Sequence, residues 1–310
     1  MVDIMSALNM IFVPMNLLGL FFGVLVGIAF GCMPGLSVNM GLALLFPLAF
    51  TFHGIGGILM LLGIYCGAIY GGSISAILLK TPGTPASVAT TLDGYPMATK
   101  LGQPGRALGL STLASTFGGI FSTICLILLA PQLAKVALQF SKPEYFALAI
   151  FGLSIITSVS SGSVIKGIMG CLIGLFLATV GIDGMSGAIR FTLDTNYFMG
   201  GVSFIPVLIG VFAFAQVLSS IEDYYHNERK EQHMMLDRLL PSFDDIKRVF
   251  STLLRSSFIG TFIGCVPGTG GDIASFVSYD QAKRWSKHSK NFGNGEPEGI
   301  VASEAGNNAV

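Results

Sequence analysis

Charged residues are scarce in this chain. Asp, Glu, Lys and Arg make up 11% of its 310 residues, against about 25% in a typical soluble domain. They are also unevenly placed, because residues 1–221 hold 12 of the 34 charged side chains and none lies between Asp3 and Lys80. Hydrophobic residues account for 52% of the chain, and the mean hydropathy is +0.72. This pattern excludes an ordinary soluble enzyme and indicates an integral membrane protein in a lipid bilayer.

Motifs that would indicate other functions are absent. The formal net charge is zero, so the sequence offers no basic surface for nucleic acid. It contains no phosphate-binding, zinc-protease, nucleophile-elbow or dinucleotide-binding motif. The five cysteines have no CxxC or Cys/His spacing, which argues against a metal site or a disulfide framework. We therefore expect no enzyme activity, no cofactor, no metal and no nucleic-acid partner.

Apolar runs that approach the ~20 residues of a membrane span recur along the chain. A polar stretch at 222–249 interrupts them and is expected to form a cytoplasmic connector. We therefore predict an all-α polytopic membrane protein, with a first repeat of about seven spans in residues 1–221 and the start of a second, truncated repeat in residues 250–310. The eight predicted spans are roughly 11–31, 38–54, 57–79, 107–131, 144–160, 164–182, 199–221 and 250–266.

The placement of Lys and Arg predicts the orientation. If the N-terminus lies outside and the spans alternate, 14 of these residues fall on the inner side and 3 on the outer side. Because positive residues accumulate on the cytoplasmic side, we expect the N-terminus outside.

Two segments resemble each other. Residues 27–35 read GIAFGCMPG and residues 260–268 read GTFIGCVPG, with five of nine positions identical. The match aligns Asn39 with Asp272. Seven predicted spans, an odd number, separate the copies, so the second copy would cross the membrane in the opposite direction. Such inverted repeats with broken helices are typical of secondary transporters. We predict this architecture, with the second repeat incomplete in this chain.

Three proline-glycine breaks interrupt the apolar segments, at Pro34-Gly35, at 81–85 and at Pro267-Gly268. Proline removes a backbone donor, and glycine permits a turn. Lipid cannot satisfy the freed backbone groups, so a break at depth must be buried in protein or line a wet cavity. A helix that restarts there directs free N–H groups into the cavity, which favours a carboxylate. Each break could instead end a span at an interfacial turn, but three breaks, two of them related by the repeat, favour the cavity.

Ionisable residues at membrane depth are candidates for function. Asp272 and Glu304 could bind a coupling proton or cation, and Asp272 could equally well cap a helix. Asp93 precedes a glycine and is expected to form a turn. The small residues from Gly67 to Ser75, spaced by four, are better explained by close helix packing than by a substrate path.

Longer motifs resemble a known family. Residues 31–50 read GCMPGLSVNMGLALLFPLAF, and YGGSISAILLKTPGTPASVATTLDGYPMA and GQPGRALG follow. Later segments read GCVPGTGGDIASFVSYDQAKRWSK and FGNGEPEGIVASEAGNNAV. These motifs resemble the large membrane subunit of tripartite tricarboxylate transporters (TctA-type), and the resemblance covers most of the chain.

The resemblance implies uptake of small di- and tricarboxylates such as citrate across a bacterial inner membrane, driven by a Na⁺ or H⁺ gradient. It also implies two partners, a periplasmic solute-binding protein and a small four-span membrane subunit. The double Asn of the family falls at Asn307-Asn308. Two departures stand out: the family often has an uncharged residue in place of Asp272, and its members continue beyond Val310.

We expect the substrate carboxylates to bind between the Pro-Gly loops near the midplane, with Asp272 or Glu304 coupling a cation. An alternative is a transport-incompetent fragment or scaffold subunit of the same complex, because the second repeat is incomplete. An intramembrane enzyme would need a catalytic pair at one depth, for which only these two acids are available. The predicted substrate-binding residues are Pro34, Gly35, Ser37, Asn39, Pro82, Gly83, Thr84, Pro267, Gly268, Thr269, Asn307 and Asn308.

Overall fold

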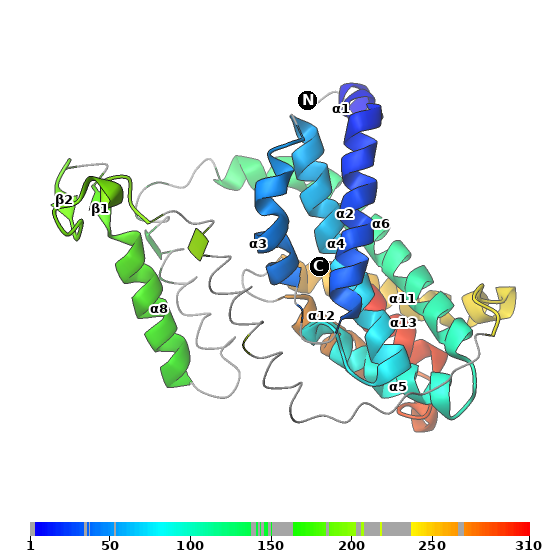
Figure 1. Cartoon of the computed structure of the whole chain (residues 1–310). Coiled ribbons are helices and arrows are strands. Elements are labelled where there is room, and N and C mark those ends of the chain that lie inside the picture. Colours follow the sequence, from blue (N-terminus) through cyan, green and yellow to red (C-terminus); the bar gives the residue numbers. More distant parts are fainter. Residues whose placement is uncertain are drawn as a thin grey trace. The chain divides into compact units, whose positions relative to one another are not determined.

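A computed structural model gives the helical framework of the chain (Figure 1). It divides into two compact units, one formed by Met1–Leu128 with Val211–Val310 and the other by Leu129–Gly210. The described part is mainly α-helical, as predicted. The residues that the structure describes are 4–33, 36, 38–52, 54–137, 141, 143, 146–147, 150, 164–183, 186–202, 206–207, 218, 237–265 and 270–310.

The first unit contains nearly all of the long helices. Helix α6 begins in it and continues past Leu128. Its helices are α1 (Ile4–Ile11), α2 (Pro14–Cys32), α3 (Val38–Ala49), α4 (Ile55–Leu79), α5 (Val88–Thr99), α6 (Pro104–Ala137), α11 (Phe243–Gly264), α12 (Gly271–Trp285) and α13 (Pro297–Asn308), with short 3-10 helices η1 (Pro85–Ser87) and η4 (Ser289–Asn291).

The second unit contains one long apolar helix and a small hairpin. Helix α8 (Val164–Ala178) is followed by β1 (Gly181–Ile182), which pairs antiparallel with β2 (Ile189–Arg190). The 3-10 helix η2 (Asn196–Phe198) comes after the hairpin.

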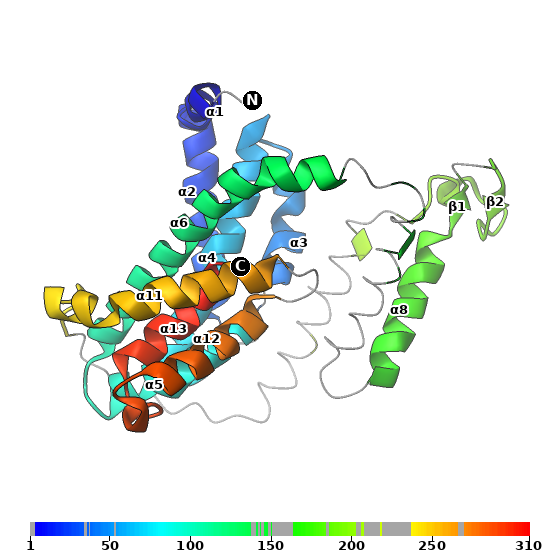
Figure 2. The same cartoon turned by 180° about the vertical axis from the view of Figure 1, so that it is seen from behind.

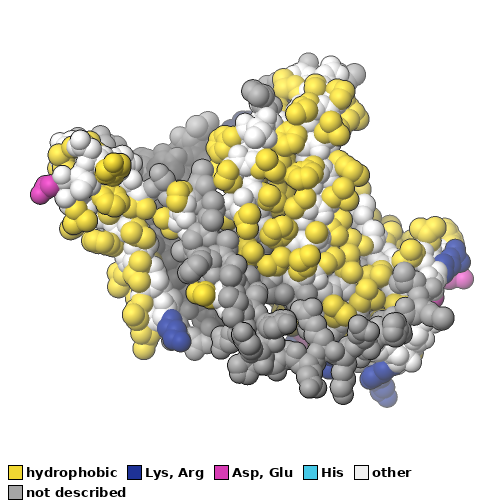
Figure 3. Space-filling model, in the orientation of Figure 1, with side chains coloured by type: hydrophobic (Ala, Val, Ile, Leu, Met, Phe, Trp, Pro, Cys, Tyr) yellow, Lys and Arg dark blue, Asp and Glu magenta, His cyan; other side chains and the backbone are white. Residues whose placement is uncertain are grey.

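Three predicted spans are confirmed as helices that are long and apolar enough to cross a membrane. Two others are apolar helices but shorter than a span. Figure 3 shows hydrophobic side chains covering the visible face of the helices that stand upright in Figure 1, α2, α3 and α4, as expected for a lipid-facing surface. Among the described residues the long apolar helices are Pro14–Cys32, Ile55–Leu79 and Pro104–Gln132, and the shorter ones are Val38–Ala49 and Ile165–Ala178.

The predicted span 250–266 falls in helix α11, which is not among the described helices that are long and apolar enough to cross a membrane, so this span is not confirmed. Helix α11 starts at Phe243, inside the stretch assigned to the polar connector. Ser242 and Asp245 form a capping box, in which each side chain accepts the other's backbone N–H at 3.1 Å. This cap starts the helix in polar sequence. The predicted spans 144–160 and 199–221 fall mostly outside the described residues, and the proposed division into repeats stays a prediction.

Helices α2 and α4 pack with their backbones in close approach. A Cβ atom on Gly23 would lie 2.2 Å from the Met60 carbonyl oxygen, and one on Gly31 would lie 2.1 Å from that of Ala68. In the opposite direction, a Cβ on Gly67 would meet the Val24 carbonyl oxygen at 2.5 Å. Only glycine fits at such distances. The small residues of α4 therefore serve helix packing, as predicted.

A second bundle is built from α11, α12 and α13, which lie side by side in Figure 2. Its core also includes residues from α4, α5 and α6. Buried apolar side chains from α4, α5, α6, α11 and α13 form one cluster, namely Ile77, Met97, Ala98, Ala107, Leu110, Ala114, Val249, Leu253, Ile300, Val301 and Ala305. The polar groups described next are enclosed by this cluster and its neighbours.

Candidate functional site

Glu304 is a fully buried carboxyl group where four helices meet. It lies on α13 with 0% of its surface exposed. Its Oε1 atom accepts hydrogen bonds from Ser73 of α4, at 2.6 Å, and from Thr90 of α5. Its Oε2 atom accepts one from Ser115 of α6 at 3.0 Å. No Lys, Arg or His in the described part of the chain lies within ion-pair distance of this carboxyl.

Further hydroxyl and amide groups surround this carboxyl. The Thr90 hydroxyl lies 2.9 Å from that of Ser303. Asn308 donates to the Ser115 hydroxyl at 3.1 Å and to the Glu304 carbonyl at 3.0 Å. Ser111, one helical turn before Ser115, is buried and has no hydrogen-bond partner among the described residues. We call Glu304, Ser73, Thr90, Ser111, Ser115 and Ser303 the hydroxyl cage.

The hydroxyl cage is chemically suited to a small cation or a proton. All of its polar side-chain atoms are oxygens, the ligand type that hard cations prefer. A buried carboxylate without a positive partner is costly. Binding a proton or a monovalent cation would remove that cost. Glu304 therefore has the environment expected of the predicted coupling residue.

The predicted break at 81–85 is buried in protein. Helix α4 ends at Leu79, and Lys80 takes a left-handed conformation with φ of 59°. Gly83 donates its N–H to the Gly72 carbonyl at 3.3 Å, and a Cβ atom on it would lie 1.9 Å from the Gly31 carbonyl oxygen. The break therefore packs against the C-terminal end of α2, where only glycine can be accommodated.

Two predicted residues in this break have contrasting surroundings. Pro82 is only partly buried, whereas Thr84 is 4% exposed. The backbone of Thr84 bonds to Ser87, whose hydroxyl donates to the Thr84 carbonyl at 2.8 Å. The Thr84 hydroxyl itself has no partner among the described residues. It packs against Gly72 of α4, where a Cβ atom would lie 2.7 Å from the hydroxyl oxygen.

The start of α12 lies against Asn307. A Cβ atom on Gly271 would lie 2.2 Å from the Asn307 side-chain oxygen. Both polar atoms of the Asn307 amide are buried and have no hydrogen-bond partner in the described part of the chain. Buried amides without partners are rare, so Asn307 is a polar group available to a ligand.

Asp272 does not cap α12, because the cap residue is Gly270 and Asp272 is the second residue of the helix. The capping alternative is therefore wrong. Its carboxylate is exposed and still lies in the first turn, where a negative charge is favourable. Asn39 is likewise the second residue of α3 and is exposed, and the predicted pairing of the two positions stays a prediction.

The remaining predicted site residues lie in the two repeat-related breaks. These are Pro34, Gly35, Ser37, Pro267, Gly268 and Thr269, and they fall outside the described residues. The helices on either side end and begin around them, with α2 ending at Cys32 and α3 beginning at Val38, and α11 ending at Gly264 and α12 beginning at Gly271. Whether the two loops form one substrate site stays a prediction.

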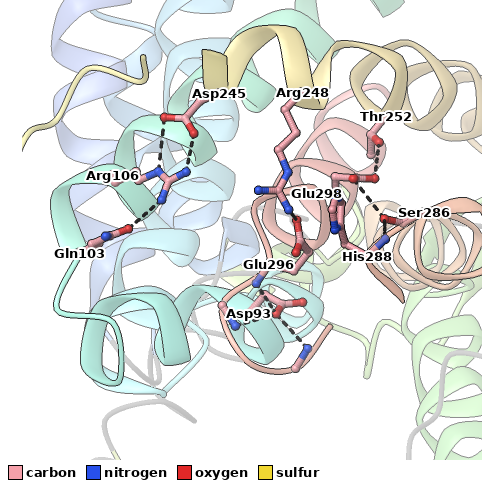
Figure 4. Close-up of polar contacts among 12 residues, drawn as sticks. Asp93, Gln103, Arg106, Asp245, Arg248, Thr252, Ser286, His288, Glu296 and Glu298 are labelled. Atoms are coloured by element: carbon pink, nitrogen blue, oxygen red, sulfur yellow. Dashed lines mark hydrogen bonds and ion pairs between the residues drawn. The ribbon is translucent and has the colours of Figure 1, made fainter. Parts of the chain in front are cut away.

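Asp93 has a role that the sequence did not predict. It lies inside α5 and is fully buried, so the expected turn is wrong. Its Oδ1 atom accepts backbone N–H groups from Gly293 at 2.8 Å, Gly295 at 2.9 Å and Glu296 at 2.8 Å (Figure 4). Its Oδ2 atom accepts the Tyr279 hydroxyl at 2.8 Å. Asp93 thus fixes the segment that leads into α13 and its Glu304.

Ion pairs hold the polar ends of these helices together (Figure 4). Arg248 of α11 pairs with Glu296 at 2.5 Å, and Arg106 of α6 pairs with Asp245 of α11. Burial opposes ionisation of Asp245, but hydrogen bonds from Arg106 and Ser242 outweigh it and lower the pKa of this carboxyl below its ordinary value. These contacts orient α11 beside α6 and α13.

The polar residues around Glu304 were missed in the sequence because each is a common small residue on an apolar helix. The only available signal was the spacing of Ser111 and Ser115, which places both on one helical face. Their convergence with Ser73 and Thr90 depends on packing between segments far apart in the chain.

Comparison with known proteins assigns the chain to one protein family. The model of the family described as "Tripartite tricarboxylate transporter TctA family" matches residues 17–310. An Agrobacterium vitis protein described as "Uncharacterized 52.8 kDa protein in TAR-I ttuC' 3'region" is 40% identical over 314 residues, covering 100% of this chain and 62% of that protein. The chain thus spans less than two thirds of that relative's length.

A shorter similarity involves a second protein from the same organism. The protein described as "Uncharacterized protein in TAR-II ttuC' 3'region" is 44% identical over 51 residues, which cover 16% of this chain and 21% of that protein. No solved structure matches the chain.

Proposed function

The chain belongs to the tripartite tricarboxylate transporter TctA family, and we propose that it is the membrane-permease subunit of a binding-protein-dependent secondary transporter for small di- and tricarboxylates. The observation that carries this proposal is the buried Glu304 in its hydroxyl cage, next to a broken helix. A buried acid of this kind gives a membrane protein a site for a coupling ion.

Glu304 would couple transport to a cation gradient. The negative charge of Glu304 lies in a fully buried site and is balanced when a proton or Na⁺ binds. The cation-bound form of the protein is therefore more stable than the cation-free form. A substrate carboxylate entering nearby brings further negative charge, which the bound cation offsets. Symport follows, because the anion and the cation favour each other's binding.

The substrate carboxylates would bind between the proline-glycine breaks, near the bilayer midplane. Free N–H groups at the restarted helices and the unpartnered groups of Thr84 and Asn307 would supply donors. The two inverted repeats would then alternate access to the two sides. Exposed Asp272 is a second candidate for cation coupling.

The proposed partners are those of a tripartite system. A periplasmic solute-binding protein would deliver the carboxylate, and a small four-span membrane subunit would complete the complex. The proposed location is the bacterial inner membrane with the N-terminus outside. A transport-incompetent fragment or scaffold subunit of the same complex is the second candidate function.

Uptake by proteoliposomes tests the proposal. Labelled citrate uptake would be measured under imposed Na⁺ or pH gradients, with the small subunit and the loaded binding protein present, for this chain and for a form as long as the relative. We expect Glu304→Gln to abolish gradient-driven uptake, because the amide keeps the shape of the side chain but carries no negative charge for a proton or Na⁺ to balance. Asp280→Asn, an exposed change on α12, is the control and should retain uptake.

The outcomes separate the two candidate functions. Uptake by the longer form alone would assign this chain the role of an inactive fragment. Uptake by both forms would support an autonomous permease. Undiminished gradient-driven uptake by Glu304→Gln would reject the coupling role of Glu304.

A further inference from the structure

We infer that the ion held by Glu304 in the hydroxyl cage is a proton and not Na⁺, and that the proton lies on Oε1 and is donated to the Thr90 hydroxyl oxygen. The role of this ion in transport rests on the proposed function, whereas its identity and position rest on the contacts of the cage. The inference thus names the coupling ion and makes Thr90 the residue that positions it.

The hydroxyl cage contains five contacts in which one oxygen must supply a hydrogen to another. Glu304 Oε1 contacts the hydroxyls of Ser73, at 2.6 Å, and of Thr90. Glu304 Oε2 contacts the Ser115 hydroxyl at 3.0 Å. The Thr90 hydroxyl also lies 2.9 Å from that of Ser303, and Ser303 donates to a backbone carbonyl of its own helix at 3.0 Å. Two oxygens at such a distance need one hydrogen between them, and their positions do not fix which one carries it.

The hydroxyl groups supply only four hydrogens for these five contacts. The residues that contribute one hydrogen each are Ser73, Thr90, Ser115 and Ser303. The Ser111 hydroxyl makes no hydrogen bond among the described residues and adds none. An ionised Glu304 carries no hydrogen, so one of the five contacts would be left unmade. A proton on Glu304 supplies the fifth hydrogen, and every contact is then a hydrogen bond.

The same count places the proton on Oε1. Ser303 uses its hydrogen for the backbone carbonyl, so the hydrogen between Thr90 and Ser303 belongs to Thr90. The contact of Thr90 with Glu304 Oε1 then needs a hydrogen from Glu304. Loading therefore forms one O–H bond on Oε1 and turns the Thr90 hydroxyl towards Ser303. Release of the proton breaks that bond, and the Thr90 hydroxyl turns back to donate to the carboxylate.

Na⁺ does not fit these contacts. Ca²⁺, which has nearly the same radius, binds about six to eight oxygens at about 2.3–2.6 Å, with the lone pairs of the oxygens directed at the ion. In the cage, the hydroxyls of Ser73 and Ser115 lie directly against the carboxyl oxygens, so hydrogens and not lone pairs occupy these contacts. Na⁺ would have to push the oxygens apart, whereas a proton needs no additional volume.

The acidic groups near the cage oppose a second negative charge. Asp93, one turn after Thr90 on α5, is fully buried and lies against Gly299 of α13, where a Cβ atom would be 2.2 Å from its Oδ2 atom. Glu298, on the same α13 helix as Glu304, is 7% exposed. Neither Asp93 nor Glu298 forms an ion pair among the described residues. Because like charges disfavour ionisation, both acids favour a neutral, protonated Glu304.

The other ionisable groups on the surrounding helices have partners of their own. Tyr70 of α4 shares a hydrogen bond with a threonine hydroxyl of α6 at 2.7 Å. Tyr279 of α12 donates to Asp93 at 2.8 Å. Arg255 of α11 donates to a carbonyl and a hydroxyl of its own helix. Helix α6 carries no ionisable residue at 107–124. The described residues therefore supply no positive charge that would replace the proton on Glu304.

Infrared spectroscopy of the purified chain in detergent tests the inference. A protonated carboxyl group has a C=O stretching band separate from the bands of carboxylates, and this band shifts in D₂O. We expect such a band at neutral pH, its loss in Glu304→Gln, and no change when NaCl replaces choline chloride at matched ionic strength. Asp280→Asn, at an exposed ion pair, is the control and should leave the band unchanged. If no band is lost in Glu304→Gln, or if Na⁺ removes the band from the unmodified chain, the inference is overturned.

Variants of Thr90 test the position of the proton. Thr90→Val removes the acceptor of the O–H group and should move the band to higher frequency, whereas Thr90→Ser keeps a hydroxyl and should leave the band in place. An unmoved band in Thr90→Val would overturn the placement. This comparison also replaces Glu304→Gln if that variant does not fold.

The infrared measurement does not depend on transport, so it separates this inference from the proposed function. With the band present, a lack of citrate uptake under both Na⁺ and pH gradients would reject the proposed function and leave the proton on Glu304. Uptake driven by a Na⁺ gradient and not by a pH gradient would overturn the proton as the coupling ion.

Discussion

Two helical groups in the first unit pack in the same way with different side chains. In the first group, α2 lies against α4 through glycines spaced by four residues. In the second, α11 lies against α13 through small residues at the corresponding positions, where a Cβ atom on Gly260 would lie 2.3 Å from the Gly306 carbonyl oxygen. The positions on α2 are Gly19, Gly23, Gly27 and Gly31, and those on α11 are Thr252, Ser256, Gly260 and Gly264.

The difference shows where the polar chemistry is concentrated. The first group has no charged residue between Asp3 and Lys80, and its glycines permit contact between backbones. The second group replaces two glycines with hydroxyl-bearing residues, and Thr252 hydrogen-bonds to buried Glu298. Glu304 lies on the same α13 helix. The first group therefore acts as a rigid support, and the second carries the ionisable groups on which the proposed coupling depends.

The largest loss of stability is expected from a substitution that forces α2 and α4 apart. Gly23→Val would place side-chain atoms on the Met60 carbonyl oxygen, so α2 and α4 would have to separate. Overpacking of this kind costs about 3 kcal/mol or more. Thermal unfolding of the detergent-solubilised chain should show a much lower midpoint. Gly170→Val, at a glycine of α8 with nothing within 4 Å among the described residues, is the control, and an equal loss in both variants would contradict the close packing.

An intermediate effect is expected from Asp93→Ala in the second group. The change leaves the N–H groups of Gly293, Gly295 and Glu296 without their acceptor, and those of Gly295 and Glu296 are buried. Each buried unsatisfied group costs about 1 kcal/mol or more, so unfolding should require about 2 kcal/mol less. Hydrogen exchange should also accelerate at these amides. Asp280→Ala, at an exposed ion pair, should change neither measurement, and protected amides in Asp93→Ala would disprove the anchoring role.

The comparison also shows what could be predicted from the sequence. The span 57–79 agrees with Ile55–Leu79 because an apolar run without charges depends only on local composition. The break after Lys80 was predicted for the same reason, since proline and glycine act locally. The turn predicted from the Asp-Gly pair at 93–94 was wrong. The Asp93 carboxylate accepts hydrogen bonds from backbone amides about 200 residues away rather than from its own segment. The hydroxyl cage likewise depends on packing between distant helices.

The smallest effect on stability is expected from a change in the first helical turn of α11, which differs from that of α2. Helix α2 starts at Pro14 without an acidic first turn, whereas α11 starts with a capping box whose Asp245 pairs with Arg106. Because the pKa of Asp245 is lowered in the folded chain, its stabilisation is present above the ordinary carboxyl pKa and is lost as the pH falls through the lowered value.

Asp245→Asn should therefore reduce the free energy of unfolding by about 1 kcal/mol at neutral pH. The difference from the unmodified chain should disappear in acid, as measured by chemical unfolding over a pH series. Asp244→Asn is the matched control, because its exposed carboxylate lies in the same first turn and forms no ion pair among the described residues. A pH-independent loss in Asp245→Asn would mean that the cap alone, and not the charge of Asp245, distinguishes the start of α11 from that of α2.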